Sequence, residues 1–190
     1  MPVVERNHHP LDDGAPTFQT RRTPEDQMTA YDVEAWHDLF VMTGGAAAAL
    51  AGLIFVAVSL NHEAILEIAA LPALAARTLS ILISLVLLSL VCLAPGQTRV
   101  LLGVEVLGIG IALAAIVLTT TIRNIGGADQ AQWRVSLIAL AIIGSLPAIV
   151  AGSSLIAGFG GGLYWLLVQC ITGIIVAVYY GWILLIEIRR

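Results

Sequence analysis

A run of uncharged residues extends from Leu39 to Leu60 and reads LFVMTGGAAAALAGLIFVAVSL. At about 1.5 Å of rise per residue, a helix of this length spans roughly 33 Å, which matches a hydrocarbon core of about 30 Å. Because no water is present in that core, a spanning segment must satisfy its own backbone hydrogen bonds, as a helix does. The run therefore predicts a transmembrane helix.

Four further segments have the same character. The chain is 58% hydrophobic and 12% charged, against about 25% charged residues in soluble domains. Proline and glycine residues separate the apolar segments from one another. The sequence therefore predicts an all-α integral membrane bundle over residues 23–190, with about five transmembrane helices at 39–60, 72–94, 100–122, 135–157 and 163–188.

The N-terminal region has a different composition. Residues 1–22 contain too few apolar side chains to bury a core, which predicts a disordered tail. Thr23 is followed by Pro24, Glu25 and Asp26, a sequence typical of the start of a helix. We therefore expect a short amphipathic helix before the first span, with Trp36 at the membrane interface.

Charge and motifs exclude several functions. The net charge of −4 comes entirely from residues 1–38, and the chain contains no lysine. A basic nucleic-acid surface, Schiff-base chemistry and a Walker-type phosphate site are therefore excluded. His62-Glu63 lacks the second histidine of a zinc signature, and no histidine within a span core can activate Ser153 or Ser154. We expect no enzymatic activity, metal or cofactor.

Arginines near the span ends predict the orientation. Residues Arg21, Arg22 and Arg99 lie on the side of the N-terminal tail, and five arginines lie on the other side: Arg77, Arg123, Arg134, Arg189 and Arg190. By the positive-inside rule this count favours a cell-membrane protein with its N-terminus outside and its C-terminus in the cytoplasm. Arg77, close to the start of the second span, is expected to snorkel outward.

Small residues recur at intervals of four in three of the spans. Since lipid provides no hydrophobic force between helices, close backbone approach over small residues is a chief way in which they associate. These faces predict either internal packing or a homo-oligomer interface. Their members are Gly44, Ala48 and Gly52 in the first span, Gly144, Ala148 and Gly152 in the fourth, and Gly173, Ala177 and Gly181 in the fifth.

Two polar features allow a different interpretation. Pro147 interrupts the fourth span and can expose backbone carbonyl groups to an ion, unless neighbouring helices repair the kink. Glu105 is the one carboxylate that lies well inside a span, where a charge is costly. It can form a site for a proton or cation with other polar residues at the same depth or end, or it can be a locally paired carboxyl. The predicted cluster is His37, Asp38, Arg99, Glu105 and Gln169.

Residues 35–61, reading AWHDLFVMTGGAAAALAGLIFVAVSLN, resemble the opening segment of a group of small bacterial multi-pass membrane proteins. Some members of this group are labelled modulators of the membrane protease FtsH. The resemblance implies that Trp36, Asp38, Ser59 and Asn61, at the two ends of one helix, matter together.

Two hypotheses follow. The first is a non-enzymatic membrane protein, surrounded by lipid, that packs against itself or a membrane protein partner and can thereby regulate that partner. The second is a small channel or transporter that uses the Glu105 cluster and the kinked fourth span.

Overall fold

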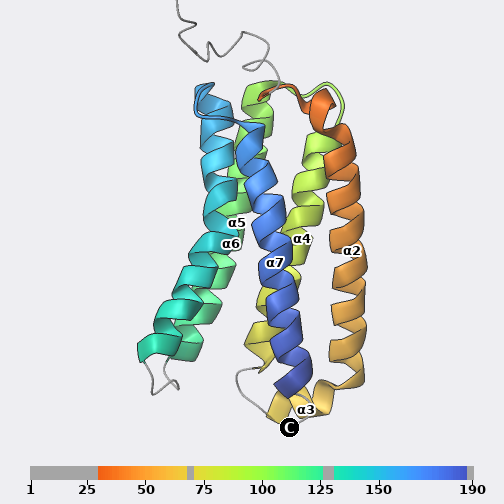
Figure 1. Ribbon diagram of the computed structural model, residues 1–190, viewed down its shortest axis with the longest axis vertical. Helices are drawn as coiled ribbons and strands as arrows, with labels where there is room; N and C mark the ends of the chain where they lie inside the picture. The colour runs from red at the N-terminus through yellow and green to blue at the C-terminus, as the bar shows by residue number, and fades with distance from the viewer. Residues whose placement is uncertain (1–29, 68–70, 126–130, 188–190) are drawn as a thin grey trace, which may run out of the picture.

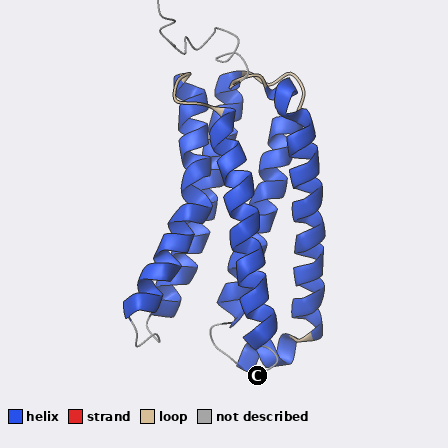
Figure 2. Cartoon of the chain, in the orientation of Figure 1, coloured by secondary structure: helices blue, strands red, loops and turns tan. Residues whose placement is uncertain are grey.

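The structure is a computed structural model that describes residues 30–67, 71–125 and 131–187. The predicted disordered tail and the predicted helix start at Thr23 lie outside these residues. In the described part the chain folds into helices, with no strand among them (Figure 2).

Five long helices form the bundle (Figure 1). They are preceded by a 3-10 helix η1 (Val33–Trp36), and a short helix α3 (His62–Glu67) follows the first long helix. All five are long and apolar enough to cross a membrane, which confirms the predicted all-α bundle with five spans. The long helices are α2 (His37–Leu60), α4 (Leu71–Leu93), α5 (Arg99–Ile125), α6 (Ala131–Ala157) and α7 (Leu163–Glu187).

Turn residues set the helix ends at the connection between α4 and α5. Gly96 adopts a positive φ of 75°, which costs a glycine little, and directs the chain back toward the bundle. Thr98 then accepts a hydrogen bond from the Leu101 N–H at 3.3 Å and caps the start of α5. At the far end, α5 and α6 extend further into their connection than predicted. Near this end of α5, polar side chains such as Thr119 donate hydrogen bonds to backbone carbonyl groups one turn earlier, which is compatible with a continuous helix.

The contacts between helices divide the bundle into a ring and an added helix. Helices α4, α5, α6 and α7 form a closed ring in which each packs against two others. Helix α2 lies outside this ring, packs mainly against α4 and touches α7 slightly, and so occupies one edge of the molecule (Figure 1). Only Phe40, Thr43 and Ala47 of α2 are fully buried.

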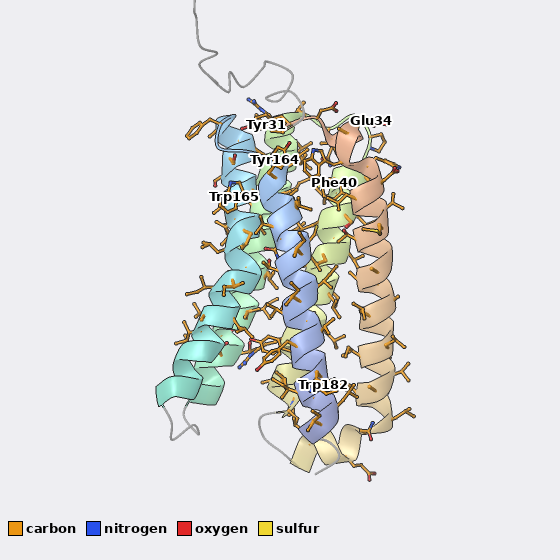
Figure 3. The ribbon with its side chains drawn as sticks, in the orientation of Figure 1. Tyr31, Glu34, Phe40, Tyr164, Trp165 and Trp182 are labelled. Atoms are coloured by element: carbon orange, nitrogen blue, oxygen red, sulfur yellow. The ribbon has the colours of Figure 1, made fainter. Side chains whose placement is uncertain are left out.

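The bundle has two distinct ends. Residue 30, η1 and the α4–α5 and α6–α7 connections lie at one end, here called the tail end, and α3 lies at the other (Figure 1). Tyr31, Tyr164 and Trp165 lie at the tail end, while Trp182 lies toward the opposite end (Figure 3). Such aromatic residues at both ends are typical of membrane interfaces.

Candidate functional site

Residues 30–36 form a strap across the tail end of the bundle. The Leu163 N–H donates a hydrogen bond to the Ala30 carbonyl at 2.9 Å, and Trp36 packs edge-on against Tyr164 with ring centroids 4.9 Å apart. Gly162 permits this crossing, because a Cβ there would collide with the Ala30 carbonyl and the Tyr31 ring. The strap is therefore held against the start of α7.

The glycine-rich connection between α6 and α7 also accommodates Arg99. A Cβ on Gly158 would lie 2.7 Å from Arg99 Nη1, so the guanidinium occupies the space that glycine leaves free. The guanidinium carbon of Arg99 also lies 5.6 Å from the centroid of the Tyr31 ring, a cation–π contact. The short connection predicted between the last two spans thus lies against both the strap and Arg99.

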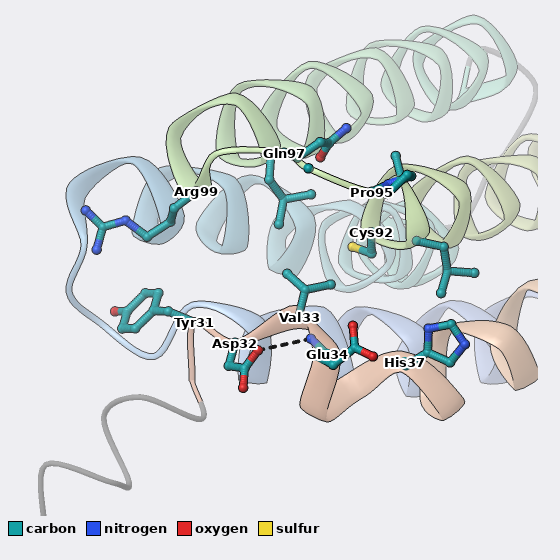
Figure 4. Close-up of a pocket in the computed structure, with 13 residues that line it drawn as sticks. Tyr31, Asp32, Val33, Glu34, His37, Cys92, Pro95, Gln97 and Arg99 are labelled. Atoms are coloured by element: carbon teal, nitrogen blue, oxygen red, sulfur yellow. Dashed lines mark hydrogen bonds between the residues drawn. The ribbon is translucent and has the colours of Figure 1, made fainter.

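A pocket of about 540 Å³ lies beneath the strap (Figure 4). The strap contributes Tyr31, Asp32, Val33 and Glu34 to its lining, and the start of α2 contributes His37. The opposite wall comes from the end of α4 and from the α4–α5 connection, and includes Cys92, Gln97 and Arg99. The pocket therefore combines charged and apolar groups at the tail end of the bundle.

Glu105 does not line this pocket but is hydrogen-bonded to a residue that does. Gln97, which lines the pocket, donates from Nε2 to Glu105 Oε2 at 2.8 Å. The other amide atom, Gln97 Oε1, is buried and has no hydrogen-bond partner. Glu105 is thus a locally paired carboxyl, and its partner is a residue outside the cluster predicted from the sequence.

The structure brings together some of the predicted polar cluster and separates the rest. His37 and Arg99 line the pocket, and Glu105 lies behind Gln97. Asp38 is exposed in the first turn of α2 and does not line the pocket. Sequence reasoning missed Glu34 and Gln97. Gln97 lies in a short turn between two spans, at the same end of the bundle as Glu105. This position in the sequence could have indicated that the two side chains meet.

Gln169 lies away from the pocket and repairs the interruption in α6. Its Oε1 accepts from the Ala148 N–H at 3.1 Å, and its Nε2 donates to the Gly144 carbonyl at 2.8 Å. In an unbroken helix these two backbone groups would bond each other, and Pro147 prevents the regular geometry. Gln169 is fully buried in this position. The backbone groups next to the kink are therefore occupied by a side chain.

Arg77 corrects one prediction. Instead of snorkelling outward, its side chain is 2% exposed, and it donates to Thr120 Oγ1 at 3.2 Å and to the Thr120 carbonyl at 2.7 Å. The prediction was wrong because it considered one helix alone, whereas α5 provides two oxygen acceptors in the interior. Arg77 therefore joins α4 to α5 inside the bundle.

The small-residue faces of α6 and α7 are used inside the chain. A Cβ on Gly152 would lie 2.5 Å from the Leu107 nitrogen, so α5 and α6 pack backbone against backbone. A Cβ on Gly173 or Gly181 would lie close to Leu85 of α4 and Ile54 of α2, respectively, and Ala177 is buried. Both faces therefore serve internal packing.

The small residues of α2 lie differently. Gly44 faces α4, and a Cβ added to it would lie 3.0 Å from the Cβ of Ser89. Other small residues of the helix are exposed, and a Cβ on Gly45 or Gly52 would meet nothing within 4 Å. We call this exposed surface the outer face of α2; it comprises Gly45, Ala48, Ala49 and Gly52.

The residues at the two ends of α2 make local contacts. Trp36 joins the strap to α7 through Tyr164. Ser59 Oγ donates to the Phe55 carbonyl and Asn61 Nδ2 donates to the Ala57 carbonyl, both at 2.8 Å. Both bonds run to carbonyl groups one turn earlier in α2, so they are local to the end of that helix.

Among the described residues, no group of three histidine, cysteine, aspartate or glutamate side chains is arranged to hold a metal ion. Comparison with known proteins finds no family model, no curated protein and no solved structure that matches this chain.

Proposed function

We propose that the protein is a non-enzymatic multi-pass membrane protein that packs the outer face of α2 against a transmembrane helix of a second copy or of a membrane protein partner. Its role toward that partner is regulatory. The resemblance of the first span suggests the FtsH protease as such a partner.

One contrast between helices supports this proposal. Most glycines of α5, α6 and α7 lie against neighbouring helices, with Gly108 of α5 as an exception, whereas both Gly45 and Gly52 of α2 have open space beside them. Small residues at intervals of three and four allow close backbone approach between helices in lipid. A helix that has this surface and leaves it uncovered is suited to binding another helix.

The second hypothesis, a channel or transporter through α6, has less support. It rests on the polar cluster around Glu105 and on backbone groups freed by Pro147, but Gln169 already occupies the adjacent Ala148 N–H and Gly144 carbonyl. A flux assay separates the two functions, because a path through Glu105 requires Glu105→Gln to reduce ion flux into proteoliposomes.

We further propose that the protein lies in the cell membrane with its N-terminus outside. Because Arg77 is buried inside the bundle, we leave it out of the arginine count. Four arginines then lie near span ends on the side of the C-terminus, and three lie on the side of the N-terminal tail. They are Arg123, Arg134, Arg189 and Arg190 against Arg21, Arg22 and Arg99.

The test is a triple substitution, Gly45→Leu with Ala48→Leu and Gly52→Leu, which fills the outer face and leaves Gly44 in contact with Ser89. Gly108→Leu on α5 is the matched control, because a Cβ at Gly108 also meets nothing within 4 Å. We expect the triple variant to lose the oligomer, or the co-purified partner, that the wild type and the control retain in mild detergent. Unchanged particle mass and partner recovery would refute the proposal.

A further inference from the structure

We propose that the interior of the bundle binds a small monovalent inorganic anion, such as chloride, between Arg77 of α4 and Tyr180 of α7. This inference is independent of the packing of α2, because it rests on the contacts of α4, α5 and α7.

The first observation is a buried positive charge without an acidic partner. Arg77 is the one charged residue among the fully buried side chains of the described part of the chain. Of the acids whose side chains are described, Glu63 is exposed on α3 and the others lie toward the tail end, namely Asp32, Glu34, Asp38 and Glu105. A charge in the interior of a membrane bundle is costly unless an opposite charge compensates it. None of the described side chains supplies that negative charge to Arg77.

Arg77 also keeps hydrogen-bond donors that its protein partner does not use. A guanidinium group carries five N–H donors. Nε donates to Thr120 Oγ1 and Nη2 donates to the Thr120 carbonyl, so both bonds go to a single residue of α5. Within the described residues Nη1 makes no hydrogen bond. The remaining N–H groups are therefore available to an anion.

The second observation is an unpartnered hydroxyl group beside this charge. Tyr180 is 1% exposed, and its hydroxyl group is buried without a hydrogen-bond partner. It interacts electrostatically with Arg77, but the geometry of the two groups gives no hydrogen bond. A buried hydroxyl group that is left unpaired destabilises the folded state. An anion next to Arg77 accepts this O–H and removes the cost.

Burial and charge together specify the kind of anion. Because Arg77 and Tyr180 are both almost completely buried, the ligand must be small. One negative charge balances one guanidinium group, whereas a divalent anion such as sulfate leaves an uncompensated charge in the interior. Chloride meets both conditions.

The location gives the anion a structural role. Arg77 lies six residues after Leu71, the first residue of α4, which is about 9 Å from that helix end at helical rise. Helix α4 packs against both α5 and α7, whereas α5 and α7 make few contacts with each other. An anion held by Arg77 and Tyr180 therefore joins α7 to the pair of α4 and α5.

The experiment titrates the purified full-length chain in detergent with sodium chloride, while sodium gluconate keeps the ionic strength constant. Thermal unfolding gives the stabilisation, and chloride NMR line broadening reports bound chloride, with bromide and sulfate added as competitors. The variants are Arg77→Met and Tyr180→Phe, the second of which removes only the hydroxyl group. Tyr179→Phe is the matched control, because Tyr179 is the neighbouring tyrosine and is 50% exposed. Each comparison is made within one variant, so a change in its basal stability does not affect the result.

We expect chloride to raise the unfolding temperature of the wild type in a saturable manner, and bromide but not sulfate to displace it. Tyr180→Phe should weaken chloride binding by at least about tenfold, because it removes a hydrogen bond to a charged group. Arg77→Met should abolish binding, and Tyr179→Phe should retain it. The absence of saturable chloride binding in the wild type, displacement by sulfate as readily as by bromide, or unchanged chloride affinity in Arg77→Met or Tyr180→Phe would overturn the proposal.

Discussion

At the scale of individual residues, Gln169 compensates for the backbone hydrogen bond that Pro147 disrupts in α6. A proline within a membrane helix leaves backbone groups that water cannot reach, so a neighbouring side chain must bond them. Gln169 provides both an acceptor and a donor, and it reaches the Ala148 N–H and the Gly144 carbonyl across the interface between α7 and α6. The interruption is therefore stabilised by one amide.

This arrangement predicts a strong coupling between the two residues. Gln169→Leu should lower the free energy of unfolding by about 1–3 kcal/mol for each backbone group that it leaves unpaired. Pro147→Ala in the same chain should recover part of this loss, because Ala148 and Gly144 can then bond each other directly. A double-mutant cycle of unfolding in mixed detergent measures the coupling. Strictly additive effects would show that Gln169 does not act on the interruption.

Arg77 leads to a second prediction at this scale. A buried charge pays a large desolvation cost, and replacing it with an apolar residue of similar volume is often neutral or stabilising. Arg77→Met should therefore change the free energy of unfolding by less than about 1 kcal/mol. Arg77→Lys should be clearly destabilising, because a lysine keeps the buried charge and loses the planar fork that reaches both Thr120 acceptors. Equal losses in the two variants would contradict this interpretation.

The side-chain positions of Arg77 and Gln169 could not be predicted from the sequence. Hydropathy locates both residues within spans but does not say which face meets a neighbouring helix. Arg77 turns inward because Thr120 of α5 offers two oxygens there, and Gln169 turns toward the interruption in α6. Each placement depends on a residue more than twenty positions away in the chain.

At the scale of helices, α5 and α6 form the closest pair. Gly103, Gly110 and Gly152 bring the two backbones so near that an added Cβ would meet atoms of the partner helix at 3.0 Å or less. Such contacts replace the hydrophobic force that is absent between helices in lipid.

Gly152→Ala should therefore separate this pair. The new methyl group meets the Leu107 backbone, which cannot rotate away, so we expect a loss of about 1–3 kcal/mol of unfolding free energy. Gly108→Ala, in open space on α5, should be neutral or slightly stabilising because alanine favours the helix by about 1 kcal/mol. Thermal unfolding of the two variants in parallel measures the difference, and an equal response would argue against close α5–α6 packing.

Helix positions were predictable from the sequence because each span is a long apolar segment bounded by polar or glycine-containing turns. The strap was not predictable in the same way. Its path depends on the Leu163 N–H and on the space left by Gly162, two features of a connection more than 120 residues further along the chain.

At the scale of the whole molecule, the bundle is a ring of four helices with α2 added at one edge. The ring is closed by its own contacts, and most of its glycines lie against a neighbouring helix, with Gly108 of α5 as an exception. Helix α2 retains an exposed small-residue surface, the outer face of Gly45, Ala48, Ala49 and Gly52. We therefore propose α2 as the helix that contacts a second copy or a membrane partner.

The most direct test of this claim is site-specific photo-crosslinking in the native membrane. A photoreactive residue at Ala48 lies on the outer face of α2, and one at Ala112 lies on an exposed position of α5 as a control. We predict a discrete protein adduct from Ala48, identifiable by mass spectrometry as a second copy or a membrane partner, and no discrete protein adduct from Ala112. The absence of a protein adduct at Ala48, or equal adducts at both positions, would contradict the claim that this face of α2 binds another helix.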